Sequence, residues 1–253
     1  MENLERRDFI KTSAVVAGGA VLSSMPLSGA YAAGSDVIKV ALVGCGGRGT
    51  GATFDALSSG MNIKVVALAD AFKDNLESTY KTLKEKWQDK IDVSDNHKFV
   101  GFDAYKDAIQ LADVVILATP PGFRPMHFEE AIRQGKHVFM EKPVAVDIPG
   151  VQQVLRVAAE AKRKKLNVVV GLQRRYQTNY REAIKRIHEG AIGDVTSGQV
   201  YWNSGGVWVR PRKPEQTEME YQMRNWYYFN WLCGDHIVEQ HVHNIDIANW
   251  VKG

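Results

Sequence analysis

Short apolar runs alternate with longer amphipathic segments between residues 37 and 170. The runs are rich in Val, Ile, Leu and Ala, and they predict buried strands at 37–43, 63–69, 97–100, 114–118, 138–140 and 167–170. The segments between them carry periodic apolar positions and predict helices at 48–59, 72–90, 125–134 and 149–165. Strands and helices that alternate at this spacing form right-handed crossovers. The pattern therefore predicts an α/β fold in which residues 36–172 build a doubly wound, parallel sheet, the Rossmann arrangement.

The pattern changes after Gly171. A helix is expected at 180–189, and the alternation at 195–202 predicts a half-exposed strand. Five of the six tryptophans also follow this point. We interpret residues 173–253 as the start of an α+β domain with an open sheet, whose later part is missing from this chain. The complete protein is expected to form a homo-oligomer.

The N-terminus has the features of an export signal. A basic start at Arg6-Arg7 is followed by a weakly apolar stretch at 14–22 and by an A-x-A cleavage pattern at 30–32. The apolar stretch is shorter than the roughly 20 residues that a membrane span needs, and the arginine pair resembles the twin-arginine (Tat) signal of bacteria. Residues 1–33 are therefore predicted to be a Tat signal peptide. The expected partner is the Tat export machinery, and the expected location is periplasmic or otherwise outside the cytoplasm.

Composition limits the remaining classes of function. With 45% hydrophobic and 24% charged residues, the chain is an ordinary folded protein. A net charge of +3 does not favour nucleic acid as a partner, and the two cysteines cannot build a disulfide framework. No membrane span is predicted in the mature chain.

A glycine-rich loop directly after the first predicted strand indicates a dinucleotide site. Its sequence is Gly44-Cys45-Gly46-Gly47-Arg48-Gly49, a G-x-G-x-x-G at the head of a helix. Gly44 permits the tight turn, Gly46 lets the backbone approach a diphosphate, and Gly49 allows close packing of helix on strand. The N-terminus of the helix offers N–H groups to the phosphates. The alternative is a glycine-rich turn without a ligand.

The end of the second predicted strand bears on the choice of cofactor. Asp70 stands there, and a carboxylate at this place accepts both ribose hydroxyls while repelling a 2′-phosphate. NAD is therefore favoured as the cofactor. Lys73 nearby leaves NADP possible.

A second motif carries a family resemblance. Glu141-Lys142-Pro143 ends a strand downstream of Thr119-Pro120, and with the glycine-rich loop this resembles the Gfo/Idh/MocA oxidoreductases over about residues 37 to 250. The resemblance implies that Lys142 lies beside nicotinamide and substrate, that Thr119 and Pro120 line the cofactor, and that Glu141 positions it. It also makes His127 a candidate for the cofactor site, with a histidine satisfied at the start of its helix as the alternative.

The chemistry of a sugar dehydrogenase fits a lysine at this position. Oxidation of a hydroxyl needs a base for the O–H proton while hydride leaves the carbon. A lysine close to a positively charged ring holds its proton less tightly than a lysine in water. Lys142 is therefore a candidate catalytic residue, and an ordinary surface lysine before proline is the alternative.

The segment from Gly234 to Trp250 carries the richest set of polar residues. The family places an acid, a histidine four residues later, an aspartate three further and an aromatic residue four beyond, and Glu239, His243, Asp246 and Trp250 match that spacing. The family's usual first residue is Asp, so Glu239 is a departure. If the segment is helical, Glu239 and His243 share one face. By the resemblance, His243 acts as acid or base or orients the substrate hydroxyl, opposite Lys142.

Further residues are candidates for binding substrate. His241 and His236 are additional histidines in the same segment, and the ring of Trp202 suits the C–H face of a sugar. A metal site formed by the histidines and acids of this segment is an alternative, as is a polar helix satisfied by its neighbours. No metal is predicted, because the family spacing fits better than any zinc signature.

These features together predict an exported NAD(P)-dependent oxidoreductase that acts on a sugar or polyol hydroxyl. Free nicotinamide nucleotide is expected to be scarce outside the cytoplasm, which favours a tightly held cofactor that is regenerated within each cycle. Two alternatives remain open. One is an NAD-dependent glycoside hydrolase that uses oxidation, elimination and reduction, and the other is a non-catalytic sugar-binding protein.

Overall fold

The computed structural model describes residues 37–253. The predicted signal peptide at 1–33 lies outside the described residues. Within 37–253, no helix combines the length and the apolar character that crossing a membrane requires.

Six parallel strands form a single sheet in the order β3-β2-β1-β4-β5-β6. The strands are β1 (Ile38–Val43), β2 (Ile63–Asp70), β3 (Lys98–Val100), β4 (Val114–Leu117), β5 (His137–Met140) and β6 (Val168–Val170). The order reverses between β1 and β4, and ligands of such folds bind at this switch point, outside the carboxyl ends of the strands. The predicted α/β, Rossmann-type fold is confirmed.

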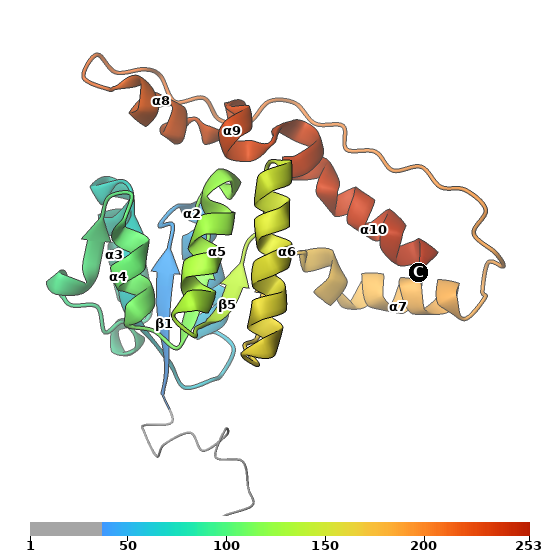
Figure 1. Ribbon diagram of the computed structural model, residues 1–253, viewed down its shortest axis with the longest axis horizontal. Helices are drawn as coiled ribbons and strands as arrows, with labels where there is room; N and C mark the ends of the chain where they lie inside the picture. Colours follow the sequence, from blue (N-terminus) through green and yellow to red (C-terminus); the bar gives the residue numbers. More distant parts are fainter. Residues whose placement is uncertain (1–36) are drawn as a thin grey trace, which may run out of the picture. The chain divides into compact units, whose positions relative to one another are not determined.

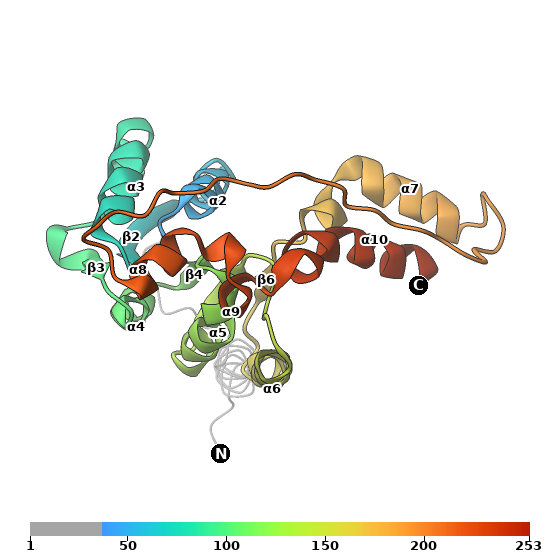
Figure 2. The same cartoon turned by 90° about the horizontal axis from the view of Figure 1, so that it is seen from above.

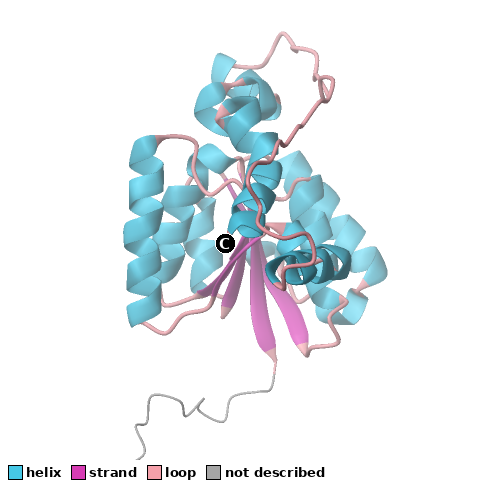
Figure 3. Cartoon of the chain, turned by 90° about the vertical axis from the view of Figure 1, so that its right-hand side faces the viewer, coloured by secondary structure: helices cyan, strands magenta, loops and turns pink. Residues whose placement is uncertain are grey.

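Helices cover both faces of this sheet, as Figure 3 shows with the strands in magenta between them. They are α2 (Gly47–Leu57), α3 (Lys73–Lys86), α4 (Ala104–Gln110), α5 (Arg124–Arg133) and α6 (Ile148–Arg163). Successive side chains of a strand point to opposite faces. Leu42 accordingly packs with α2 and α3, whereas Val43 packs with α4, α5 and α6. Both faces are buried, which is why the strands read as continuous apolar runs.

Short 3-10 turns lie in the connections of the Rossmann unit. They are η1 (Gln88–Lys90), η2 (Asp95–His97) and η3 (Pro121–Phe123). The helix predicted at 72–90 accordingly ends at Lys86, and its last residues form η1.

After β6 the chain is helical or irregular. Its elements are η4 (Gln173–Tyr176), α7 (Thr178–His188), α8 (Glu218–Arg224), η5 (Trp226–Tyr228), α9 (Asn230–Cys233), the π-helical turn η6 (Ile237–His241) and α10 (Val242–Lys252). Figure 1 shows α10 beside α7. In Figure 2 the chain leaves α7 and returns past α2 to α8, where Arg224 contacts Asp74 of α3.

The strand predicted at 195–202 is wrong, because this segment is irregular and largely exposed. A strand needs a neighbour to complete its backbone hydrogen bonds. Within residues 37–253 the sheet ends at β6, and no strand lies beside this segment. The alternating pattern alone therefore did not produce a strand here.

Candidate active site

The glycine-rich loop lies at the switch point of the sheet, between the end of β1 and the start of α2. Gly44 has φ +99°, and a Cβ at this position would stand 2.5 Å from the backbone nitrogen of Thr119. At Gly49, a Cβ would stand 1.9 Å from the carbonyl oxygen of Gly44. Both positions therefore require glycine, one for its turn and one for the approach of helix to loop.

The two middle glycines of the loop, Gly46 and Gly47, face open space. A Cβ on Gly46 or Gly47 would meet no atom within 4 Å. Gly46 is the N-cap residue of α2. It has no side chain, and it therefore forms no capping hydrogen bond with the first N–H groups of the helix. The first N–H groups of α2 are thus directed at the open side of the loop, a geometry that fits the diphosphate of a dinucleotide.

Asp70 is fixed at the end of β2. Its carboxylate accepts hydrogen bonds from the backbone N–H groups of Cys45 at 2.7 Å and Phe72 at 2.8 Å, with Asn75 Nδ2 at 3.5 Å. Burial raises the pKa of Asp70, and these hydrogen bonds oppose that shift. The carboxylate retains acceptor capacity for the two hydroxyls of a ribose. Loop and carboxylate together therefore fit NAD.

A cleft of about 1000 Å³ runs from this loop to the C-terminal helices. It has two walls. The Rossmann wall consists of the loop, the ends of the strands and the residues after them; the C-terminal wall consists of residues between 202 and 243. Most predicted site residues line the cleft: Gly44, Gly46, Gly47, Arg48, Asp70, Thr119, Pro120, His127, Glu141, Lys142, Trp202, Glu239 and His243.

Lys142 joins the two walls through an ion pair with Glu239. Its Nζ donates to Glu239 Oε1 at 2.9 Å and also to the Glu239 backbone carbonyl. Both side chains are nearly buried, with 12% and 8% exposed. Glu239 lies in the π-helical turn, and such turns interrupt the regular ladder of carbonyls and are frequent at functional sites. Burial raises the pKa of Glu239, while the charge of Lys142 opposes the shift.

His243 lies next to this pair and is neutral at pH 7. Burial, together with the positive charges of Lys142 and Arg174, lowers the pKa of His243 to about 4. The Trp202 ring stacks on its imidazole with a centroid separation of 5.9 Å and an interplanar angle of 26°. An uncharged imidazole that faces a cleft can accept a proton from a bound hydroxyl.

Asp246 and Trp250, the other two residues of the family spacing, anchor the helix from outside the cleft. The Asp246 carboxylate accepts three hydrogen bonds from Arg175, at 2.8, 2.9 and 3.1 Å. The Arg175 guanidinium also lies 4.9 Å from the centroid of the Trp250 ring. These contacts fasten α10 to η4 and so help to fix the position of His243.

Glu141 connects the loop to the end of β5. Its Oε1 accepts a hydrogen bond from Arg48 Nε at 2.6 Å. The carboxylate lies closely against Gly171, where a Cβ would stand 2.7 Å from Glu141 Oε2. Glu141 therefore holds Arg48, and through it the glycine-rich loop, in place.

His127 is enclosed by aromatic rings rather than open to solvent. Tyr105 and Phe123 lie 4.2 and 6.0 Å away between ring centroids, and Thr119 Oγ1 lies 3.1 Å from His127 Nδ1. Burial, aided by the charge of Arg124, lowers the pKa of His127 to about 3. The neutral imidazole thus orients Thr119 at the edge of the cleft.

Arg124 is a site residue that the sequence analysis missed. Its side chain is buried at 1% exposure, and Nη2 donates to the Thr119 carbonyl at 2.7 Å. Burial lowers its pKa to about 10, opposed by the charges of Glu141 and Glu239. The one available signal was a cation at the first residue of a helix, where the helix dipole disfavours it.

Two predicted residues do not line the cleft. Gly49 lies under the loop, where the close packing of helix on strand requires it. His241 lies outside the cleft, with its ring centroid 6.4 Å from that of His236. His236 in turn lies 3.0 Å from the Trp202 carbonyl oxygen and so supports that residue. Within residues 37–253, no three His, Cys, Asp or Glu side chains gather in an arrangement that could hold a metal ion.

The loop, the acidic end of β2 and the paired lysine define a dinucleotide-binding protein of the Rossmann class. The model of the Gfo/Idh/MocA oxidoreductases, a family described by its NAD-binding Rossmann fold, matches residues 38–172. The chain belongs to this family. The prediction of an NAD-type cofactor is thereby confirmed at the level of the family.

Individual relatives are more distant. A glycosyl hydrolase family 109 protein from Solibacter usitatus is 26% identical over 218 residues, which cover 80% of this chain and 47% of the relative. Inositol 2-dehydrogenase from Rhizobium meliloti is 26% identical over 198 residues, covering 78% and 50%. The chain spans about half the length of these curated relatives.

A solved structure shows the same fold. Scyllo-inositol dehydrogenase from Lactobacillus casei, determined with bound NAD(H) and scyllo-inositol, is similar with a TM-score of 0.59. Its identity to this chain is 23%, and the match covers 86% of this chain and 56% of the dehydrogenase.

Proposed function

We propose that this protein is an NAD(P)-dependent oxidoreductase acting on a hydroxyl of a sugar or polyol. The observation that carries the proposal is the convergence of Lys142, Glu239 and a neutral His243 on the cleft that also contains the glycine-rich loop. Rossmann domains hold the dinucleotide at this edge of the sheet, so a substrate beside Lys142 and His243 would face its nicotinamide.

The three side chains have different roles in the reaction of the substrate hydroxyl. His243 is uncharged at neutral pH and accepts the hydroxyl proton. Lys142 donates a hydrogen bond to the same oxygen and stabilises the negative charge that develops there, while Glu239 fixes the position of Lys142. Trp202 offers a flat apolar face to the C–H groups of the ring. NAD⁺, when bound, supplies the hydride acceptor.

The comparisons support the polyol class of substrate. The Rhizobium relative is named for an inositol substrate, and the Lactobacillus structure holds scyllo-inositol together with NAD(H). Both ligands present a ring of hydroxyls, which is the chemistry that a base, a hydrogen-bond donor and an aromatic face recognise.

We further propose that residues 1–33 direct export through the Tat pathway and that the protein leaves the cytoplasm with its cofactor already bound. The support is the order of the sequence features, with the arginine pair first and the A-x-A pattern last. Fractionation of cells, with N-terminal sequencing of the exported form, tests this. Changing Arg6 and Arg7 to Lys should keep the protein in the cytoplasm, and export that persists after this change would contradict the proposal.

The redox reaction is tested with NAD-loaded protein and a panel of aldoses and inositols. At least one compound should change the absorbance of the bound nicotinamide, and His243→Ala should abolish that change while the protein still binds NAD. His241→Ala, a histidine outside the cleft, is the matched control and should react normally. NAD-loaded protein that no sugar or polyol oxidises or reduces would contradict the proposal, as would a fully reactive His243→Ala.

Glycoside hydrolysis is a second candidate, favoured by the similarity to the glycosyl hydrolase family 109 protein. Oxidation at C3 acidifies the proton on C2, so that the leaving group on the anomeric carbon can be eliminated. Water then adds to the double bond, and reduction of the C3 ketone by the bound NADH restores NAD⁺. Aryl glycosides distinguish the two activities. Release of the aryl alcohol by NAD-loaded protein indicates the hydrolase, whereas a change in nicotinamide redox state without release indicates the oxidoreductase.

A further inference from the structure

Residues 207–228, called here the strap, lie across the end of β2 and the start of α3. The strap contains residues that line the cleft, among them Trp208, Arg210, Met223 and Trp226. It thus contributes a large part of the C-terminal wall. No sequence motif pointed to this contribution.

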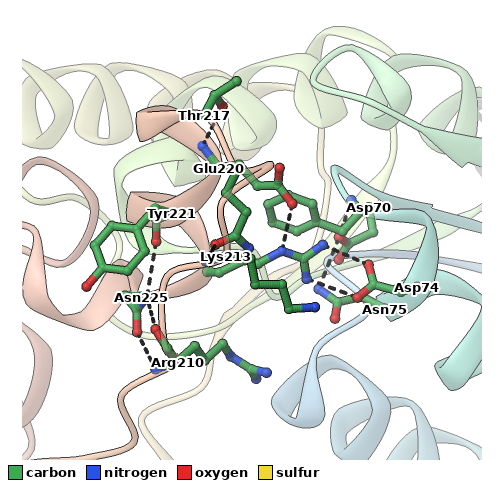
Figure 4. Close-up of polar contacts among 12 residues, drawn as sticks. Asp70, Asp74, Asn75, Arg210, Lys213, Thr217, Glu220, Tyr221 and Asn225 are labelled. Carbon is green, nitrogen blue, oxygen red and sulfur yellow. Dashed lines mark hydrogen bonds and ion pairs between the residues drawn. The ribbon is translucent and has the colours of Figure 1, made fainter.

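The strap is fastened to the Rossmann domain by Arg224. Its guanidinium pairs with the Asp74 carboxylate at 3.0 and 3.2 Å and lies 4.0 Å from the centroid of the Phe72 ring. Glu220 accepts a further hydrogen bond from Arg224 at 3.0 Å. Figure 4 shows these contacts beside Asp70. The Arg224–Asp74 ion pair, called here the clamp, therefore lies at the position where the adenosine ribose of a Rossmann ligand binds.

Hydrogen bonds inside the strap fix its backbone. Asn225, 2% exposed, accepts from the Arg210 N–H at 2.7 Å and donates to the Arg210 carbonyl at 3.1 Å. The Tyr228 hydroxyl accepts a hydrogen bond from the Val207 N–H at 3.1 Å and donates one to the Val207 carbonyl at 2.8 Å. The backbone of Arg210 is consequently held in one position above the cleft.

Arg210 differs from every other cation that lines the cleft. Arg48, Lys142 and Arg224 are each paired with a carboxylate, and Arg124 is buried with its guanidinium bonded to a carbonyl. The Arg210 guanidinium is exposed and has no hydrogen bond or ion pair within residues 37–253. In Figure 4 its side chain runs away from Asn225, on the side of the view where α2 lies.

We propose that the strap is the closing wall of the dinucleotide site and that Arg210 binds the diphosphate of the cofactor. The inference rests on the proposed function. Among the cations that line the cleft, only Arg210 is both exposed and unpaired, since Arg124, whose Nε and Nη1 have no hydrogen-bond partner within residues 37–253, is buried. Asp70 disfavours a 2′-phosphate at the ribose, so the diphosphate is the anion assigned to Arg210. Because the adenosine half then lies beneath the strap, the nucleotide leaves only after the Arg224–Asp74 pair opens.

The role of Arg210 is tested by titrating cofactor-free protein with NAD and, separately, NADP. Arg210→Met should weaken binding of both nucleotides by roughly tenfold or more, because a charge-assisted hydrogen bond to phosphate is lost. Arg212→Met removes the same charge from the strap outside the cleft and should leave both affinities unchanged. Unchanged NAD affinity in Arg210→Met, or a loss confined to NADP, would overturn the assignment.

Retention by the strap is tested by the rate at which bound NADH is displaced by excess NAD. Asp74→Asn should accelerate release by roughly tenfold, since the charged clamp is removed from an exposed position where folding is little affected. Asp107→Asn, an exposed aspartate of α4, is the control. Equal release rates in the two variants would overturn the closing role. Wild-type protein that binds no NAD would instead overturn the proposed function itself.

Discussion

The two walls of the cleft are held together by different means. The Rossmann wall is built by backbone, with a positive φ at Gly44 and a helix that approaches to where only Gly49 fits. The C-terminal wall is built by side chains that reach across the fold, such as Lys142 to Glu239 and Arg224 to Asp74. A backbone wall offers the same N–H groups to any dinucleotide, whereas a side-chain wall selects substrate and controls release. The difference separates general cofactor binding from the particular reaction.

The largest effect is expected at the contact that joins the two walls. Lys142→Met should reduce kcat by about 10³-fold, because a group that handles charge on the reacting oxygen is lost. NAD affinity should change little, since the glycine-rich loop and Asp70 remain. Steady-state kinetics and a binding titration on the same preparation check both halves of this prediction. Lys81→Met, which removes an exposed lysine of α3, is the control.

A loss of NAD affinity as large as the loss of kcat would show that Lys142 belongs to the cofactor site alone. This result would contradict the assignment of Lys142 to the reacting hydroxyl and, with it, the separation of cofactor binding from substrate chemistry.

A side chain at the closest backbone contact of the Rossmann wall should destabilise the fold. Gly49→Ala is expected to lower the free energy of unfolding by about 3 kcal/mol, because the new methyl group meets a backbone carbonyl that cannot yield. Gly51→Ala in the same helix is the matched control. Its nearest neighbour lies 3.5 Å away, at the flexible end of Arg48, so alanine should stabilise by roughly 0.5 to 1 kcal/mol.

Denaturant unfolding of the two alanine variants checks this pair. Equal stabilities would show that the loop yields to a Cβ and is not defined by its backbone.

His243 should make the C-terminal wall sensitive to acid. Its pKa is lowered to about 4 in the folded protein, while a histidine in an unfolded chain titrates near 6.5. Between these values the unfolded chain binds the extra proton, so stability is full above pH 6.5 and falls as the pH drops towards 4. His243 should account for roughly 2 kcal/mol of that loss.

Unfolding free energies of wild type and His243→Asn at pH 4 and pH 7 give this contribution as a difference. His127, whose pKa of about 3 is also lowered by burial, is present in both proteins and cancels. The wild type should lose more stability between the two pH values than the variant does, and equal losses would contradict a buried, neutral His243.

The fold of the Rossmann wall was predictable because each of its signals is local. Continuous apolar runs indicated β1, β2 and β4, and two signals of the loop lie within its own strand–turn–helix unit: the positive φ of Gly44 and the approach of Gly49 to the Gly44 carbonyl. The partner of Lys142 stands 97 residues away, and the partner of Arg224 stands 150 residues away. Local sequence spacing does not predict contacts over such separations. The family resemblance placed only His243 opposite Lys142, and neither the pairing of Lys142 with Glu239 nor the strap was predicted.

The false strand at 195–202 and the missed Arg124 have related causes. Alternation predicts a strand only where a neighbouring strand exists, and the described residues provide none. Arg124 was overlooked because a charged residue beside Pro125 reads as a helix start on the surface. The charges of Glu141 and Glu239, which favour the protonated guanidinium, approach it only in the folded protein.

The most direct test of a cleft closed over its cofactor is to denature the purified protein and to identify the nucleotide released. Near-stoichiometric NAD or NADH is the expected result, since the loop binds the dinucleotide and the strap retains it. Protein that releases no nucleotide, and that also fails to bind added NAD, would contradict both the cofactor site and the proposed oxidoreductase.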